Sequence, residues 1–286
     1  MTILDGKALS NKIKEEVKVE VEELQSTKQI TPGLAVILVG NDAASATYVG
    51  MKAKSCKNAG IYSVVHEMPD TISQNEILDI IYRMNENPNL DGILVQLPLP
   101  SQIDTTTILE AIDPQKDVDG FHPYNVGRMV SNLDAFLPAT PFGVMRLLEE
   151  YDIDLVGKNV CIIGASDIVG KPMAALMINA RATVEVCNSK TKDLKAHTLN
   201  ADILIVAAGR VNLITEDMVK EGSIVVDVGI NRLETGKLVG DVDYEACKDK
   251  CSFITPVPGG VGPMTIAMLL KNTVKAAKLR EKREKN

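Results

Sequence analysis

Short apolar runs alternate with helical segments along most of this chain, and this alternation limits its fold more than any other feature. The run at 34–39 is apolar throughout and lies between Gly33 and Gly40, as is typical of a strand buried on both faces. Leu, Ile and Val recur at helical spacing over residues 7–25, which predicts an amphipathic helix. Strands that alternate with helices pair in parallel through right-handed crossovers, so we expect an α/β fold with a mostly parallel sheet.

Two such series follow one another. In the first, we expect strands at 34–39, 62–68 and 92–96 and helices at 7–25, 44–59, 74–85 and 105–112. In the second, which begins with a helix at 140–151, we expect strands at 159–163, 183–187, 203–207, 224–228 and 252–255. The stretch 113–120 contains Pro, Asp and Gly, interrupts the alternation and marks the junction between the two series.

The length of 286 residues is enough for about two domains. We therefore expect one domain over residues 1–139 and a second over residues 140–263. The last segment, 264–286, reads largely as one helix and has room to pack back on the first domain. That packing would make the first domain discontinuous in sequence.

The composition excludes several classes of protein. There are 31 Lys and Arg against 38 Asp and Glu, a net charge of −7, and no Trp, which argues against a nucleic-acid partner. No apolar stretch reaches the roughly 18 residues of a membrane span, and no signal peptide precedes the first helix. We expect a cytoplasmic protein without a membrane partner. Its five Cys form no C-x-x-C pair, which indicates reduced thiols and no metal site.

A glycine-containing loop joins the predicted strand 159–163 to a helix that starts near Lys171. A strand, a turn with glycines and a helix N-terminus in this order present backbone N–H groups to a phosphate, so residues 164–170 predict a dinucleotide site. The spacing differs from G-x-G-x-x-G, because Ser166 stands at the second glycine and Gly170 comes one position late. A plain strand-to-helix turn is the alternative.

The end of the next strand bears on the choice of cofactor. An NAD site usually places an acidic residue there to hold the ribose hydroxyls, whereas this chain has Asn188-Ser-Lys-Thr. Hydroxyls and Lys190 tolerate or attract a 2′-phosphate, so NADP is favoured over NAD. An exposed polar loop without a ligand would have the same composition, and Glu185, inside the strand, is a weaker candidate for a ribose contact.

Polar side chains collect near the carboxyl ends of the first series of strands, where parallel sheets bind ligands. Tyr48 and Lys52 are four residues apart on one predicted helix and share a face. Gln96 ends the strand 92–96. Asp119 lies at the domain junction, although a turn alone would also explain residues 117–120.

The glycine-rich segment 256–265 precedes the last helix and also has two interpretations. Its glycines allow a ligand to approach the backbone closely at a helix N-terminus. Alternatively, the segment is only a rigid linker before the last helix.

Six segments match one enzyme family in order and near its spacing, and they are 45–52, 95–100, 116–120, 164–172, 227–231 and 256–265. Over essentially its whole length the chain resembles the bifunctional methylenetetrahydrofolate dehydrogenase/methenyltetrahydrofolate cyclohydrolases, the FolD family. The resemblance implies an N-terminal α/β catalytic domain, a Rossmann-like NAD(P)-binding domain and an active-site cleft between them. It also implies NADP-dependent oxidation of 5,10-methylenetetrahydrofolate to the methenyl compound, hydrolysis of that compound to 10-formyltetrahydrofolate, and a homodimer.

The same resemblance assigns roles to individual residues. It makes Lys52, Tyr48 and Gln96 catalytic: the lysine assists the addition of water, the glutamine orients it and the tyrosine packs on the pterin. Asp119 would hold the amide and amino edge of the pterin. Further folate contacts are implied for Val95, Leu97, Pro258, Gly259, Gly260, Val261 and Gly262, and cofactor contacts for Gly164, Ala165, Ser166, Ser189, Lys190 and Ile230. Many members have Arg at the position of Ala165, where it meets the 2′-phosphate, so this departure weakens the preference for NADP.

Three other interpretations are open at this point. Short-chain dehydrogenases also use Tyr-x-x-x-Lys, but there the pair follows the dinucleotide loop, whereas Tyr48 and Lys52 precede Gly164. A relative with dehydrogenase activity alone would be expected to have altered Lys52. A nucleotide-binding regulatory module would have no reason to keep Lys52, Gln96 and Asp119 together.

Overall fold

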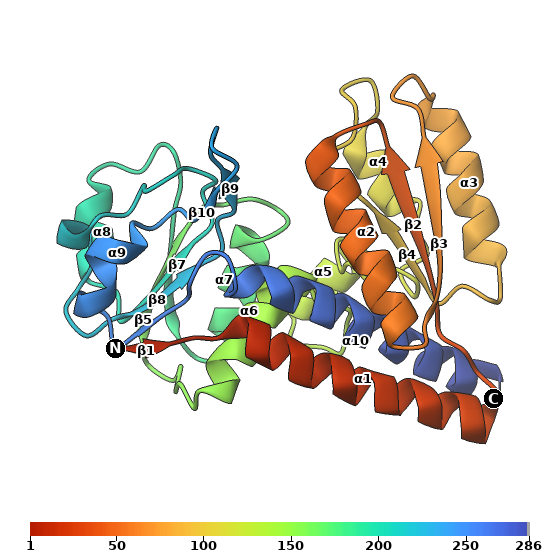
Figure 1. Cartoon of the computed structure of the whole chain (residues 1–286), viewed down its shortest axis with the longest axis horizontal. Helices are drawn as coiled ribbons and strands as arrows, with labels where there is room; N and C mark the ends of the chain where they lie inside the picture. Colours follow the sequence, from red (N-terminus) through yellow and green to blue (C-terminus); the bar gives the residue numbers. More distant parts are fainter. Residues whose placement is uncertain (285–286) are drawn as a thin grey trace. The chain divides into compact units, whose positions relative to one another are not determined.

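The computed structural model describes residues 1–284 of the chain, which folds as two compact units (Figure 1). We name each unit after its sheet. The six-stranded unit consists of Met1–Ser10, Met129–Leu133 and Thr140–Thr265. The three-stranded unit consists of Asn11–Arg128, Asp134–Ala139 and the residues from Ile266 onward.

The sheet of the three-stranded unit is parallel, with β2 (Gly33–Val39) between β3 (Tyr62–Met68) and β4 (Gly92–Val95). Every residue of β2 is buried, which confirms the prediction from its continuous apolar run. The helices that lie wholly or mostly in this unit are α1 (Gly6–Lys28), α2 (Ala43–Asn58), α3 (Gln74–Glu86), α4 (Thr105–Glu110), α5 (Pro123–Val130) and α10 (Val261–Glu284). Ile37, Ile77, Ile81, Ile93 and Ile108 are fully buried in the core between the sheet and α3 and α4.

The sheet of the six-stranded unit is also parallel, in the order β1-β11-β8-β7-β5-β6. Its strands are β1 (Thr2–Ile3), β5 (Asn159–Ile163), β6 (Thr183–Cys187), β7 (Ile203–Val206), β8 (Ile224–Asp227) and β11 (Phe253–Ile254). The helices that accompany it are α6 (Ala139–Glu150), α7 (Gly170–Asn179), α8 (Leu194–Leu199) and α9 (Tyr244–Cys247). The strands β9 (Asn231–Arg232) and β10 (Leu238–Val239) form a separate antiparallel pair.

The predicted strands and helices are present, and several short elements were not predicted. The two residues of β1 complete the edge of the six-stranded sheet, the helix α5 follows the junction segment, and β9 pairs with β10. The helix α5 has eight residues, fewer than the window of about 11 over which helical periodicity is judged, and β1, β9 and β10 have two residues each. The strand β4 ends at Val95, one residue earlier than expected, because Pro98 and Pro100 follow and cannot donate ladder hydrogen bonds.

The C-terminal part of α10 packs in the three-stranded unit. Its Lys271 and Lys278 pair with opposite oxygens of Glu20 on α1, at 2.7 and 2.5 Å. Asn272, which is 2% exposed, donates from Nδ2 to the carbonyl oxygens of Val118 and Leu137 at 2.8 and 3.0 Å. This helix therefore fixes the loop that contains Asp119.

Two further structural findings concern possible membrane spans and the cysteines. None of the helices within residues 1–284 is both long and apolar enough to cross a bilayer. All five Cys are free and buried, and burial raises the pKa of Cys56 to about 12 and that of Cys251 to about 11. Such thiols are protonated and unreactive at neutral pH.

Candidate functional site

A buried lysine is the centre of the polar group in the three-stranded unit. The helix α2 follows β2 and is capped by Asp42, whose carboxylate accepts a hydrogen bond from the backbone N–H of Ser45. The next turns carry Tyr48, which is half-buried, and Lys52, which is only 7% exposed. A lysine is rarely buried without a partner, so its contacts are informative.

Gln96 is that partner. Lys52 Nζ donates to Gln96 Oε1 at 3.0 Å, and Gln96 Nε2 donates to the carbonyl oxygen of Leu97 at 2.8 Å. The second bond fixes the amide so that its oxygen faces the lysine. Gln96 comes directly after β4, and its backbone N–H donates to Ile37 of the neighbouring β2, so the carboxyl ends of two adjacent strands position the pair.

Burial lowers the pKa of Lys52, because an ammonium group loses its hydration in the protein interior. The charge of Asp119 and the Cys56 thiol act in the opposite direction and raise that pKa. A lysine with a lowered pKa supplies a neutral amine more readily at neutral pH, which a proton acceptor needs.

The loop around Asp119 is formed by its neighbours and not by Asp119 itself. The buried carboxylate of Asp117 accepts hydrogen bonds from the backbone N–H groups of Phe121 and His122 and from Asn125 Nδ2, at 2.8 to 3.1 Å. Gly120 has φ of +74°, and a Cβ there would collide with the backbone of Leu137 and Pro138. Turn formation therefore explains Asp117 and Gly120.

Asp119 has no such structural task. Within the described residues its half-buried carboxylate makes no hydrogen bond or ion pair. Burial raises its pKa to about 6, the charge of Lys52 lowers it and that of Asp117 raises it further. An incompletely solvated carboxylate beside a buried amine is suited to accept N–H groups of a ligand.

The other residues expected near the folate differ in exposure. Burial raises the pKa of the Tyr48 phenol, which leaves an uncharged aromatic surface beside Lys52 on α2. The side chain of Val95 is 2% exposed and belongs to the hydrophobic core, so it can reach a ligand only through its backbone. Leu97 is half-buried and contributes its carbonyl oxygen to Gln96.

The glycine-containing loop in the six-stranded unit has the tight geometry expected of a phosphate loop. Gly164 has φ of +114°, and a Cβ there would collide with the carbonyl oxygen of Ala207 on the neighbouring strand end. A Cβ at Gly170, the first residue of α7, would collide with the carbonyl oxygen of Gly164. The hydroxyl of Ser166 accepts from the N–H groups of Val169 and Gly170 at 3.2 and 3.4 Å. Both glycines are therefore sterically required.

This loop lines a cavity of about 460 Å³ at the carboxyl ends of β5, β6 and β7. Its walls include the expected residues Gly164, Ala165, Ser166 and Ser189, together with Asn188, Thr191, Leu194, Ala207, Ala208, Arg210 and Leu213. No carboxylate lines it, and Glu185 is paired with His197 Nδ1 at 2.7 Å. A cavity with a glycine loop and no acidic residue fits a phosphorylated dinucleotide. Lys190 is exposed and, like Ile230, is not among the lining residues.

The segment Pro258–Gly262 belongs to the six-stranded unit. The Gly259 carbonyl oxygen accepts from the backbone N–H of Lys7 at 2.8 Å, and a Cβ on Gly6 would collide with the carbonyl oxygen of Gly260. A Cβ on Gly262 would lie 3.1 Å from the side chain of Ile230. The structure therefore brings a residue expected at the folate next to one expected at the cofactor.

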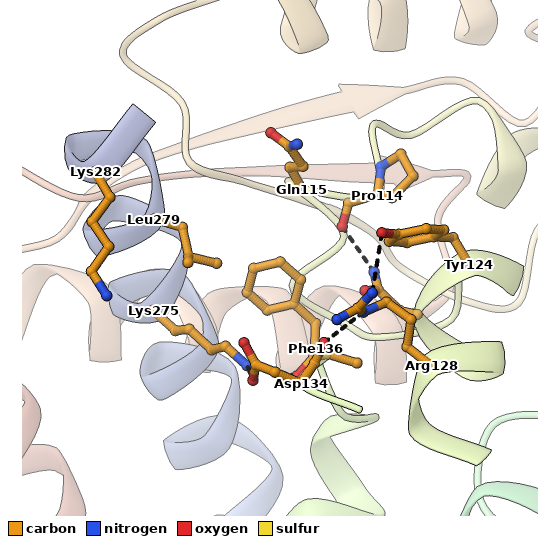
Figure 2. Close-up of a pocket in the computed structure, with 11 residues that line it drawn as sticks. Pro114, Gln115, Tyr124, Arg128, Asp134, Phe136, Lys275, Leu279 and Lys282 are labelled. Atoms are coloured by element: carbon orange, nitrogen blue, oxygen red, sulfur yellow. Dashed lines mark hydrogen bonds and ion pairs between the residues drawn. The ribbon is translucent and has the colours of Figure 1, made fainter. Parts of the chain in front are cut away.

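A separate cavity of about 270 Å³ lies between α5 and the C-terminal part of α10 (Figure 2). Arg128 and Lys275 both line it and are both engaged: Arg128 Nε donates to the Asp134 carbonyl oxygen at 2.7 Å, and Lys275 Nζ pairs with the Asp134 carboxylate at 2.5 Å. Their charges also lie over the rings of Tyr124 and Phe136, at 5.5 and 5.4 Å from the centroids. These cations hold the segment 134–136 in place.

Among the cavity residues that were not predicted from the sequence, Arg210 is the cationic one. A signal was available, because the predicted strand at 203–207 ends at the same sheet edge as the glycine loop. Asp241 was also missed: its buried carboxylate accepts from the backbone N–H groups of Ala208, Gly209 and Arg210 at 2.6 to 2.9 Å. It is distant in sequence and nothing in its neighbourhood marks it.

Two family models together cover most of the chain. The model described as tetrahydrofolate dehydrogenase/cyclohydrolase, catalytic domain, matches residues 4–119. The model described as the NAD(P)-binding domain of the same enzymes matches residues 138–281.

Individual proteins agree with these matches. The chain is 78% identical over 284 residues to a protein of Aliarcobacter butzleri named bifunctional protein FolD, covering 99% of both chains. The crystal structure of the FolD methylenetetrahydrofolate dehydrogenase/cyclohydrolase of Campylobacter jejuni is 62% identical, with a TM-score of 0.96 over 98% of this chain and 99% of that one. A Trypanosoma brucei enzyme of the same description, complexed with NADP and an inhibitor, is 36% identical, with a TM-score of 0.95 over 98% of both chains.

Proposed function

The chain belongs to the tetrahydrofolate dehydrogenase/cyclohydrolase family, and from this membership we propose that it catalyses two consecutive reactions of one-carbon metabolism. It oxidises 5,10-methylenetetrahydrofolate to 5,10-methenyltetrahydrofolate with NADP, and it hydrolyses the methenyl compound to 10-formyltetrahydrofolate. The observation that carries this proposal is the buried Lys52, held by Gln96 next to the unpartnered carboxylate of Asp119.

The dehydrogenase reaction needs little acid–base chemistry from the protein. NADP, when bound, accepts a hydride from the methylene carbon. The protein orients the folate, excludes water and tolerates the positive charge that develops on the carbon. A phenol kept neutral by burial, such as Tyr48, can pack on the pterin without introducing a charge.

The cyclohydrolase reaction is where Lys52 acts. The neutral amine accepts a proton from water as the water oxygen forms a bond to the methenyl carbon. The resulting ammonium returns a proton to N5 as the bond between that carbon and N5 breaks, which leaves the formyl group on N10. One proton is released to solvent overall. The bond from Nζ to Gln96 Oε1 directs the amine, so Gln96 is a positioning residue.

Asp119 recognises the substrate in this proposal. Its carboxylate accepts hydrogen bonds from the amide and amino N–H groups of the pterin, a pairing that satisfies both oxygens. Leu97, the backbone of Val95 and the segment Pro258–Gly262 supply the remaining folate contacts. The low exposure of Asp119 makes these bonds stronger than they would be in water.

For the cofactor, we propose that Gly164, Ala165 and Ser166 hold the pyrophosphate of NADP at the N-terminus of α7. Ser189 and Lys190 face the ribose, and Ile230 is a further cofactor contact. The support is the glycine geometry of the loop and its place on the wall of the 460 Å³ cavity.

We further propose a cytoplasmic homodimer. The strand β6 is an edge of the six-stranded sheet, and its Thr183, Glu185 and Val186 are exposed. An edge strand with exposed side chains is open to pairing with a second copy. Light scattering on the purified protein tests the dimer, and fractionation of cells tests the location.

The decisive experiment follows the two reactions separately. Purified protein is mixed with 5,10-methylenetetrahydrofolate and either NADP or NAD, and nicotinamide reduction is recorded by absorbance. In a second assay the decay of added methenyl compound is recorded without nucleotide. We expect reduction of NADP and accelerated decay. Reduction without accelerated decay would indicate a dehydrogenase alone, and turnover of neither folate would indicate a nucleotide-binding regulatory module.

A further inference from the structure

Among the residues that line the cofactor cavity, one has a cationic side chain. It lies neither in the glycine loop nor in the turn after β6. The position after Gly164 is Ala165, which has no charge. Lys190 follows β6, but it is not among the residues that line the cavity. Arg210, which follows β7, does line it.

The side chain of Arg210 is available to a ligand. It is exposed, and within the described residues its guanidinium has no hydrogen bond or ion pair. The carboxylates nearby have other partners: Glu185 binds His197 at 2.7 Å, and both oxygens of Asp241 accept backbone N–H groups. An anion that enters the cavity would therefore meet a positive charge that no carboxylate already neutralises.

The backbone that presents Arg210 is fixed. Asp241 Oδ1 accepts from the Arg210 N–H at 2.9 Å and from Asn231 Nδ2 at 2.8 Å, while Oδ2 accepts from Ala208 and Gly209. Asp241 itself is completely buried. A rigid backbone removes the cost of ordering the loop, so only the Arg210 side chain itself has to be ordered when a ligand binds.

Small polar side chains from the turn after β6 line the same cofactor cavity. Asn188, Ser189 and Thr191 line the cavity, and Thr191 Oγ1 accepts from the backbone N–H of Asn188 at 2.9 Å, which closes the turn after β6. In a dinucleotide-binding fold the end of this strand lies at the adenosine ribose. Hydroxyls there can donate to a phosphate on the ribose, whereas an acidic residue would repel it.

We propose that Arg210 binds the 2′-phosphate of NADP, together with Ser189, and so determines the preference for NADP over NAD. This inference rests on the proposed dehydrogenase function. The planar guanidinium offers two parallel N–H groups to phosphate oxygens, a geometry that the single ammonium of a lysine cannot match.

The test compares binding of nucleotides that differ only in the 2′-phosphate. Isothermal titration calorimetry measures Kd for NADP and NAD, and for the fragments adenosine 2′,5′-bisphosphate and 5′-AMP, with wild type and with Arg210→Gln. We expect the Kd for NADP and for the bisphosphate to rise about 10- to 100-fold in the variant, the factor for loss of a charge-assisted hydrogen bond, and the Kd for NAD and 5′-AMP to change less than about twofold.

Matched controls separate charge from position. Lys192→Gln removes an exposed lysine of the same segment that does not line the cavity and should leave all four Kd values within about threefold of wild type, whereas Lys190→Gln tests the rival cation. Arg210→Lys should retain part of the preference for NADP. Phosphorus NMR gives a readout independent of affinity: bound to wild type, the 2′-phosphate should titrate at lower pH than in free NADP, and this shift should shrink in Arg210→Gln.

Four results would overturn the inference. Equal losses for NADP and NAD would place Arg210 on the part of the cofactor that both share. A larger loss in Lys190→Gln than in Arg210→Gln would give the 2′-phosphate to the lysine. If wild type binds no nucleotide at all, the proposed function itself fails and this inference with it, whereas a preference that survives in Arg210→Gln overturns the inference alone.

Discussion

Burial disfavours the charged forms of Lys52 and Asp119, whereas the charge of each residue stabilises the charged form of the other. Burial lowers the pKa of Lys52 and raises that of Asp119 to about 6, and the attraction between the two charges acts against both shifts. Near neutral pH the neutral amine of Lys52 and the protonated carboxyl group of Asp119 are therefore more populated than they are for the same groups in water. Shifts of this kind beside an unpartnered carboxylate are typical of sites selected for chemistry and not for stability.

Replacement of Lys52 tests the division of labour between the two reactions. Lys52→Gln removes the proton acceptor but keeps a polar side chain of similar length, so cyclohydrolase activity should fall at least about 100-fold while hydride transfer remains measurable. Spectrophotometric assays of both reactions check this. Lys54→Gln, an exposed lysine on the same helix, is the matched control and should leave both rates unchanged. A comparable loss of both activities in Lys52→Gln would show that its role is misassigned.

The raised pKa of Asp119 predicts a pH-dependent cost in stability. Its folded pKa of about 6 lies above the ordinary value of 3.8, so the folded state binds the proton more tightly than the unfolded state. Ionisation therefore reduces the free energy of unfolding as pH rises from about 4 to 6. Asp119→Asn should melt about 2–4 °C above wild type at pH 8, and the two should melt together at pH 4. Calorimetry at both pH values decides, with exposed Asp70→Asn as a control that should show no such trend.

Among the elements, those with strong local signals could be predicted from sequence. The strand β2 was predicted from its apolar run and the amphipathic helix α1 from its helical spacing. Gln96 was predicted as the last residue of a strand that in fact ends one residue earlier, at Val95. The strand β1 could not be predicted, because two residues carry no periodicity and only pairing with β11 makes them a strand. Arg210 was missed for a related reason: its importance depends on which strand ends lie side by side.

The turn between β5 and α7 offers a test of the glycine requirement. Gly164→Ala would place a Cβ against the Ala207 carbonyl oxygen at a positive φ, so we expect a loss of at least about 2 kcal/mol in stability and weaker NADP binding. Gly157→Ala is the matched control, since Gly157 also has a positive φ, of +71°, but nothing lies within 4 Å of its added Cβ. Denaturant unfolding and nucleotide titration measure both effects. Equal costs at the two positions would mean that φ alone matters and that the close strand contact does not.

At the scale of the whole molecule, each unit is assembled from segments that are far apart in sequence. The first residues of the chain supply β1 to the six-stranded sheet, and residues from Ile266 onward belong to the three-stranded unit. The length of the last helix indicated that it has room to pack back on the first domain. The sequence does not show which side chain connects that helix to the rest of the three-stranded unit. The link is Asn272, whose amide donates to Val118 and Leu137 on the two sides of the Asp119 loop.

Asn272 therefore provides the test at this scale. Asn272→Leu keeps the volume but removes the donor from the buried carbonyl oxygen of Val118 and from the part-buried one of Leu137, which should cost about 2–3 kcal/mol in the free energy of unfolding. The loop that carries Asp119 loses its anchor, so folate affinity should fall several-fold while NADP affinity stays unchanged. Asn179→Leu is the control, because Asn179 Nδ2 makes the same kind of bond, at 2.8 Å to the Met129 carbonyl oxygen, within the six-stranded unit. It should reduce stability without weakening folate binding, and if both variants weakened folate binding equally, the effect of Asn272 would be one of general stability and not of support for Asp119.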